Sequence, residues 1–146
     1  MLISEDKILE LIPQRQPMIM IGCLVSCDEK QAVSQFTIRE DNPFADENGF
    51  TASGLMETMA QTSAARIGYL LNKPGELPNK KPPIGVIGSI KNFTLYFQPE
   101  TGSIITTTIV VEHEVMQATI IKGMVEAGGK LAAEGVLQIY LTEEQA

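Results

Sequence analysis

Residues 48–65 read NGFTASGLMETMAQTSAA, a segment with one charged side chain, that of Glu57. Apolar or small side chains recur at the i, i+3, i+4 and i+7 positions, which predicts a helix over about 53–71. They are Leu55, Met56, Met59, Ala60, Ser63, Ala64, Ile67, Leu70 and Leu71. Because they surround the axis on every side, we expect the helix to be buried. Glu57 is then an acid in an apolar wall.

A buried carboxyl must be paired, hydrogen-bonded or held neutral, because an isolated buried charge costs roughly several kcal/mol. Burial raises the pKa of Glu57, whereas the helix N-terminus and nearby amides lower it. A displaced pKa in a cleft is typical of a functional group. The alternative is a structural acid bonded to a neighbouring backbone amide. Both interpretations stay open from the sequence.

The chain has 146 residues, which favours one domain spanning 1–146. Its formal charge of -7 repels phosphate backbones and anionic bilayers, so nucleic acid and membranes are not expected partners. The start of the chain lacks the pattern of a secretory signal, and we expect a cytoplasmic protein. The candidates for a basic docking patch, or for ordinary solvated surface charge, are Arg15, Arg66, Lys73, Lys80, Lys81 and Lys91.

Cysteine and histidine are scarce. Cys23 and Cys27 fall four residues apart in an expected strand, about 13 Å from each other, which is too far for a disulfide. With one histidine in the chain, a zinc site is poorly supplied with ligands. We therefore expect reduced thiols, no metal and no cofactor.

Turn residues divide the rest of the chain into short elements. We expect a helix over 4–12 with Ser4 at its cap, and a hairpin of strands 18–27 and 32–39. Residues 41–49 form an irregular lead-in to the long helix, and 72–83 form a loop. Further strands are expected at 84–97, 103–114, 116–127 and 131–141, with a break near Glu114 and a hairpin turn at Gly128-Gly129.

This order predicts an α+β fold in which a curled antiparallel sheet wraps around one long central helix. One small sheet rarely encloses a helix of five turns, so we expect a second subunit to cover the remaining face.

Several motifs together resemble the hotdog-fold superfamily, and within it the 3-hydroxyacyl-(acyl carrier protein) dehydratases. Ile12-Pro13-Gln14-Arg15-Gln16-Pro17 is similar to the family's opening Leu-Pro-His-Arg-Xaa-Pro, and Asn42-Pro43-Phe44 to its Asn-Xaa-Phe. Glu57-Thr58-Met59-Ala60-Gln61 is similar to the central Glu-Ala-Met-Ala-Gln. The segment from Gly88 to Gly102 resembles the strand and Pro-Gly turn that follow. The resemblance covers essentially the whole chain.

The chain departs from that family at its histidines. Gln14 stands at one histidine position, and residues 45–50 lack the family's Gly-His-Phe-Pro-Gly and its catalytic histidine. In detail the sequence looks more like a divergent branch of dehydratase-like proteins of bacterial aryl-polyene and related pigment or fatty-acid pathways.

The resemblance implies site residues. Glu57 matches the family's catalytic carboxylate. The family's Met-Pro-Gly at the helix start is replaced by Thr51-Ala52-Ser53, but the unpaired amides of Ser53, Gly54 and Leu55 are expected to face a thioester oxygen as the family's do. Gln61, one turn beyond Glu57, is expected to orient Glu57 or the substrate hydroxyl.

Other residues carry alternatives. Asn48 is expected to bind substrate in place of the missing histidine or to serve only as a turn residue, and Asp46 is an alternative base. Ser53 is interpreted as a helix cap rather than a nucleophile, and His113 as a surface residue.

The resulting hypothesis is a lyase that acts on or binds 3-hydroxyacyl or enoyl thioesters of acyl carrier protein or coenzyme A, as a homodimer or dimer of dimers. Two alternatives stay open. One is an acyl thioesterase in which Glu57 activates water; the other is a non-catalytic acyl-carrier-binding partner subunit.

Overall fold

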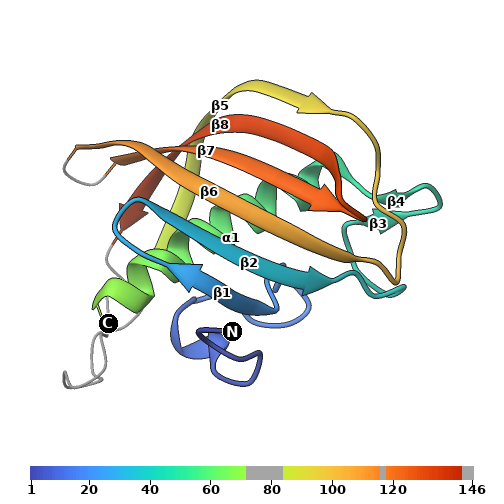
Figure 1. Ribbon diagram of the computed structural model, residues 1–146, viewed down its shortest axis with the longest axis horizontal. Coiled ribbons are helices and arrows are strands. Elements are labelled where there is room, and N and C mark those ends of the chain that lie inside the picture. The colour runs from blue at the N-terminus through green and yellow to red at the C-terminus, as the bar shows by residue number, and fades with distance from the viewer. Residues whose placement is uncertain (72–83, 116–117, 143–146) are drawn as a thin grey trace.

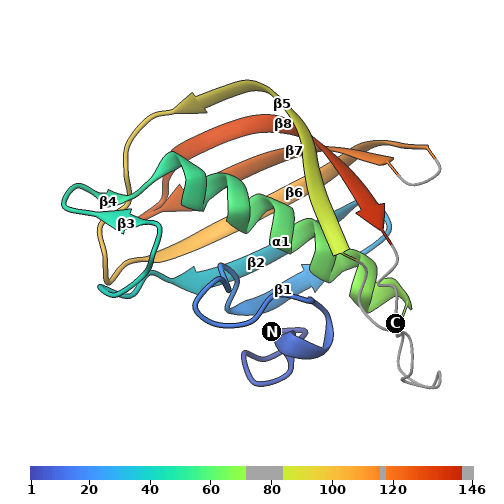
Figure 2. The ribbon, with the colours of Figure 1, turned by 180° about the vertical axis from the view of Figure 1, so that it is seen from behind.

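The protein forms an antiparallel sheet of six strands curled around one long helix (Figure 1). The computed structural model describes residues 1–71, 84–115 and 118–142. The strands lie in the order β1-β2-β6-β7-β8-β5, and α1 crosses the concave side of the sheet (Figure 2). Their bounds are β1 Cys23–Cys27, β2 Gln31–Thr37, α1 Ala52–Leu71, β5 Ile84–Leu95, β6 Ile104–Val115, β7 Ala118–Ala127 and β8 Lys130–Thr142. The predicted α+β hotdog fold is confirmed.

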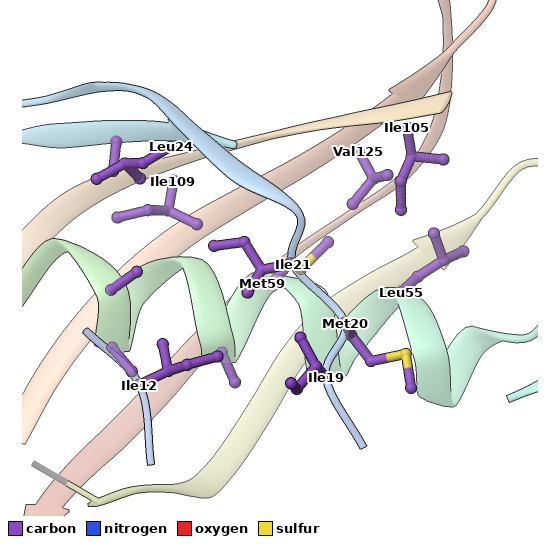
Figure 3. Packing of buried hydrophobic residues seen from close by; sticks show 14 of the residues in the cluster. Ile12, Ile19, Met20, Ile21, Leu24, Leu55, Met59, Ile105, Ile109 and Val125 are labelled. Carbon is purple, nitrogen blue, oxygen red and sulfur yellow. The ribbon is translucent and has the colours of Figure 1, made fainter. Parts of the chain in front are cut away.

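The core lies between α1 and the sheet. Leu55 and Met59 of α1 are fully buried and face Ile105, Ile109 and Val125 of the sheet (Figure 3). A Cβ atom at Gly123 of β7 would lie 2.5 Å from the Met59 sulfur, so glycine is what lets the helix approach the strand this closely. The apolar periodicity of residues 55–71 thus predicted both the helix and its burial correctly.

A small hairpin positions the start of α1. It consists of β3 Ala45–Asp46 and β4 Gly49–Phe50, which the sequence indicated only as an irregular lead-in. Gly49 has a φ of 118°, and a Cβ there would lie 2.4 Å from the carbonyl oxygen of Pro99. The Phe50 amide donates to that same oxygen at 2.8 Å. The hairpin is therefore held against the turn before β6, and it delivers the chain into α1 at a defined point.

The N-terminal segment packs along α1 (Figure 2). A Cβ at Gly68 would lie 2.5 Å from the backbone oxygen of Leu11, so the two backbones are almost in contact. The predicted helix over 4–12 is wrong: only one 3-10 turn, η1 Ile8–Glu10, forms. Ser4 does not cap it, because the Ser4 hydroxyl donates to the side chain of Asp6 instead.

The first hairpin is shorter than predicted. Only Cys23–Cys27 joins the ladder with β2, whereas the strand was expected from residue 18. Residues 18–20 do not pair with β2, because Met18 O and Met20 N are hydrogen-bonded to the side chain of Gln61 on α1.

The second group of strands is close to prediction. Gly128 and Gly129 adopt φ values of 60° and 77° between β7 and β8, which confirms the Gly-Gly hairpin turn. The break predicted near Glu114 falls one residue later, since β6 ends at Val115 and β7 begins at Ala118. Before it ends, β6 contains a bulge between Val111 and His113. The predicted loop 72–83, with Lys73, Lys80 and Lys81, lies outside the described residues.

Arg66 is buried, which contradicts its expected place on the surface. Its side chain is 2 % exposed and forms an ion pair with Glu114 at 3.1 Å. It also donates to the carbonyl oxygens of Asp28 and Glu29. Arg66 therefore joins α1 to the β1–β2 turn and β6, and it does not belong to a basic docking patch.

The two cysteines form no disulfide. Cys23 and Cys27 are free, and burial raises the pKa of Cys27 to about 11. Within residues 1–71, 84–115 and 118–142, no three His, Cys, Asp or Glu side chains gather in a way that could hold a metal ion. None of the helices in those ranges has the length and hydropathy needed to cross a bilayer.

Candidate functional site

Glu57 and Gln61 form a hydrogen-bonded pair on α1. The two residues lie one helical turn apart, and Gln61 Nε2 donates to Glu57 Oε1 at 2.9 Å. Gln61 is 0 % exposed, whereas Glu57 is half-buried. The structure therefore brings together two of the residues that the sequence singled out.

Gln61 also binds the backbone of the segment that precedes β1. Its Nε2 donates to Met18 O at 2.7 Å, and its Oε1 accepts from Met20 N at 2.6 Å. These contacts join residues 43 and 41 positions apart in the chain. Sequence reasoning missed them, because a backbone group carries no residue-type signal.

Burial raises the pKa of the Glu57 carboxyl above its usual value. The hydrogen bond from Gln61 acts in the opposite direction, because an N–H donor stabilises the carboxylate. Burial is the larger effect. A carboxyl of this kind keeps its acid form at higher pH than an exposed glutamate, which suits it to proton transfer near neutral pH.

Glu57 lies beside a helix face that the described chain leaves partly open. At helical spacing, this face carries Ser53, Met56, Ile67 and Leu71, which are half-buried or exposed, and between them Ala60 and Ala64, which are buried. Gln61 lies on the other side of Glu57, beneath the N-terminal segment. Glu57 is therefore at the boundary between the covered and the open parts of α1.

The amides at the start of α1 are more engaged than the sequence indicated. Thr51, not Ser53, occupies the cap: its carbonyl accepts from Leu55 N at 3.0 Å, and its hydroxyl lies 3.4 Å from Gly54 N. The expectation that the Leu55 amide is free to face a thioester oxygen is therefore wrong. Gly54 is buried, and a Cβ there would lie 2.5 Å from the Phe50 ring. Ser53 is exposed.

Asn48 and Asp46 belong to the β3–β4 turn. The Asn48 side chain is exposed, and its backbone amide donates to Asp46 Oδ1 at 2.8 Å. Asp46 Oδ1 also lies 3.3 Å from Gln98 Nε2. No hydrogen bond joins Asn48 or Asp46 to Glu57 or Gln61 among the described residues. His113 is exposed on β6, as predicted for a surface residue.

A broad groove of about 800 Å³ opens elsewhere, between the N-terminal segment and β1 and β2. Its walls include Ile8, Ile19, Cys23, Phe36 and Asn42. Glu57 and Gln61 do not line it. Met18 and Met20 lie against Gln61 while Ile19 and Ile21 line the groove, so the extended segment 18–21 separates the two places.

Several solved structures have the same fold. A chain of the dehydratase heterocomplex ApeI:P from Xenorhabdus doucetiae superposes with a TM-score of 0.78 at 16 % identity, covering 94 % of this chain and 91 % of that one. The HP0420 homologue from Helicobacter felis superposes with a TM-score of 0.65 at 17 % identity, covering 90 % of this chain and 97 % of that one. A hypothetical thioesterase with coenzyme A from Streptococcus pneumoniae superposes with a TM-score of 0.61 at 9 % identity, covering 84 % of this chain and 87 % of that one. At these identities the likeness establishes the fold.

A comparison with curated proteins returned no match. A comparison with protein families matched residues 6–146 to a family described as ApeP-like, ApeP dehydratase. The match spans nearly the whole chain, including the β3–β4 hairpin, α1 and every strand of the sheet. The chain belongs to the ApeP-like dehydratase family.

Proposed function

We propose that the protein is a 3-hydroxyacyl thioester dehydratase in which Glu57 transfers the proton. The observation that carries this proposal is the Glu57–Gln61 pair, a carboxyl with a raised pKa held at the open boundary of α1. Two other displaced carboxyls, Asp6 and Asp28, differ: hydrogen bonds from Ser4 and from the Lys30 amide, respectively, lower their pKa values. Membership in the ApeP-like dehydratase family supports the same chemistry.

Dehydration removes a proton from C2 and the hydroxyl group from C3 of the thioester. In the simplest balanced route, the Glu57 carboxylate takes the C2 proton and returns it to the departing hydroxyl. A double bond forms between C2 and C3, water leaves, and the carboxylate is regenerated. This route needs no second titratable side chain, and none is hydrogen-bonded to Glu57 among the described residues.

A dimer completes the proposed site. The strand β5 ends the sheet, so its outer backbone groups lack a ladder partner among the described strands. On the open face of α1, the apolar side chains of Met56 and Ile67 are also only half-buried. A second copy joined near β5 and this face would bury both and enclose Glu57. We propose a homodimer or dimer of dimers that binds acyl carrier protein or coenzyme A thioesters in the cytoplasm.

Substitution of Glu57 by glutamine tests the dehydratase proposal. Glu57→Gln keeps the acceptor for Gln61 but cannot carry the proton, so we expect enoyl thioester hydration to fall by at least about 100-fold. The matched control is Glu112→Gln, at an exposed acid on β6, which should keep full activity. Full activity of Glu57→Gln with an unchanged far-UV spectrum would remove Glu57 from the mechanism.

The products separate dehydration from hydrolysis. Incubation with a 3-hydroxyacyl thioester should yield a conjugated double bond, followed by its ultraviolet absorbance. Release of free thiol instead, measured with a thiol reagent, would favour the thioesterase alternative.

A second candidate function is a subunit of a two-chain dehydratase. It is favoured by the exposed position of His113, which is not hydrogen-bonded to Glu57 among the described residues, and by the similar structure that is itself a chain of a dehydratase heterocomplex. In that case another hotdog chain provides the base and Glu57 acts as the acid. Mixing with a histidine-containing homologue tests this: activity that appears only in the mixture would support the heteromer. Full activity of this chain alone would exclude it.

A further inference from the structure

Every polar group of the Gln61 side chain is engaged in a hydrogen bond. The two N–H groups on Nε2 donate to Met18 O at 2.7 Å and to Glu57 Oε1 at 2.9 Å, and Oε1 accepts from Met20 N at 2.6 Å. Gln61 is fully buried, so water does not compete for these contacts. Both N–H groups are in use, so a substrate hydroxyl could accept from Gln61 only by displacing Met18 O or Glu57 Oε1, which makes Gln61 a poor donor to substrate.

The backbone contacts fix which way the amide of Gln61 points. Met20 N is a donor and needs an oxygen, whereas Met18 O is an acceptor and needs an N–H. Reversing the amide would place two donors against each other at Met20 and two acceptors at Met18. Each mismatch would leave a buried polar group without a hydrogen-bond partner, which is unfavourable. Gln61 therefore always presents an N–H group to Glu57.

A fixed donor at Oε1 decides where the acid form of Glu57 holds its proton. The carbonyl oxygen of a carboxylic acid accepts an N–H group better than its hydroxyl oxygen does, so the donor favours Oε1 as the carbonyl and Oε2 as the atom that carries the proton. Oε2 makes no hydrogen bond to the described residues. Resting on the proposed function, we infer that Gln61 is a positioning residue, which directs the transferable proton of Glu57 to Oε2.

No charged side chain competes with Gln61 for Glu57 among the described residues. Arg15, in the N-terminal segment, donates to the carbonyl oxygens of Ile12 and Gln14. Arg66, on α1 itself, is bound to Glu114 and the β1–β2 turn. Gln61 is the one hydrogen-bonding partner of the Glu57 side chain in the described chain.

The inference is tested by titrating Glu57 directly, without substrate. Side-chain carboxyl signals of protein labelled with ¹³C-glutamate are followed against pH, and the Glu57 signal is the one absent from Glu57→Gln. Gln61→Met removes the donor with little change of shape, and we expect an upward shift of the Glu57 pKa because the carboxylate loses its stabilising N–H. An unchanged or lowered pKa would overturn the inference.

Thr62→Val is the matched control. Thr62 is the next residue on α1, is equally buried, and loses comparable hydrogen bonds, to Ser34 and to Thr58 O, without touching Glu57. We expect it to destabilise the fold but to leave the Glu57 pKa where it is. An equal upward shift in Thr62→Val would mean that loosened packing, and not the lost donor, moves the pKa.

A measurement on the unmodified protein covers the case in which Gln61→Met does not fold. The Gln61 side-chain amide protons should exchange slowly with water, and their chemical shifts should follow the Glu57 titration. Rapid exchange, or shifts independent of that titration, would overturn the inference. The Glu57 pKa and the exchange of the Gln61 amide protons are both measured without turnover. Full activity of the Glu57→Gln variant would therefore defeat only the proposed function. An unmoved pKa beside an inactive Glu57→Gln would defeat only the role of Gln61.

Discussion

The pairing of Glu57 with Gln61 shows how one residue determines the chemistry available to another. Their spacing of four residues on a helix is visible in the sequence, and the hydrogen bond between them is the expected consequence. The sequence left open whether Gln61 orients Glu57 or contacts substrate. Its contacts to Met18 and Met20 favour the first role, because they use its second N–H group and fix the direction of its amide.

The stability of the protein should depend on the ionisation of Glu57. Its raised pKa in the folded state means that its contribution to stability is complete below about pH 4.3, the usual glutamate value, and is lost as pH rises through the folded pKa. Glutamine cannot ionise, so Glu57→Gln should melt at a higher temperature than the parent at pH 8, and the difference should shrink toward pH 4. Calorimetry across this range checks it.

The control for this experiment is again Glu112→Gln, which removes a charge from an exposed position. Its free energy of unfolding should differ from that of the parent by no more than about 0.5 kcal/mol, the usual range for surface substitutions. Its melting temperature should therefore follow that of the parent at every pH. A Glu57→Gln advantage that is the same at every pH would show that ionisation of Glu57 is not its source.

At the scale of elements, the sides of α1 are buried to different degrees. The sheet covers Leu55 and Met59, the N-terminal segment covers Gly68, and the face with Met56 and Ile67 is only half-buried. The sequence predicted that a second subunit covers the face that the sheet leaves free, and this stays a prediction. The N-terminal segment covers part of the helix, which was not anticipated.

Gly68 tests the contact between α1 and the N-terminal segment. In an exposed helix, replacing glycine by alanine stabilises by about 1 kcal/mol. Here the new Cβ would lie 2.5 Å from Leu11 O, a backbone atom, so the segment would have to move. We expect Gly68→Ala to destabilise by about 1–3 kcal/mol in urea unfolding. Ser53→Ala, at an exposed position of the same helix, should change stability by less than about 0.5 kcal/mol. A gain in stability from Gly68→Ala would contradict the observed packing.

At the scale of the whole molecule, one edge of the sheet lies close to α1. The strand β5 ends the sheet and contacts α1, and Figure 2 shows it passing beside the C-terminal half of the helix. Val86 on β5 is 51 % exposed, although apolar. A long strand edge of this kind invites pairing with another chain, and a second subunit there would remove the exposed edge.

A charge placed on the open face of α1 should weaken the proposed dimer. Ile67→Glu would bury an unpaired carboxylate in the interface, and we expect the dissociation constant to rise by at least about 100-fold. Ile104→Glu is the control, since Ile104 is an isoleucine 57 % exposed on β6, an inner strand of the sheet. Sedimentation velocity over a range of concentrations measures both. Equal dimerisation of the two variants would place the interface elsewhere.

Local sequence determined the elements and their order. The helix was predicted at 53–71 and forms at 52–71, and the Gly-Gly hairpin forms where expected, because helical periodicity and turn chemistry involve only residues near in the chain. Glu57 and Gln61 were identified for the same reason. The tertiary structure alone decided that residues 18–20 bind Gln61 instead of extending β1, and that Arg66 is buried. These outcomes depend on groups some 40 residues apart, whose meeting is set by how the elements pack and not by any local pattern.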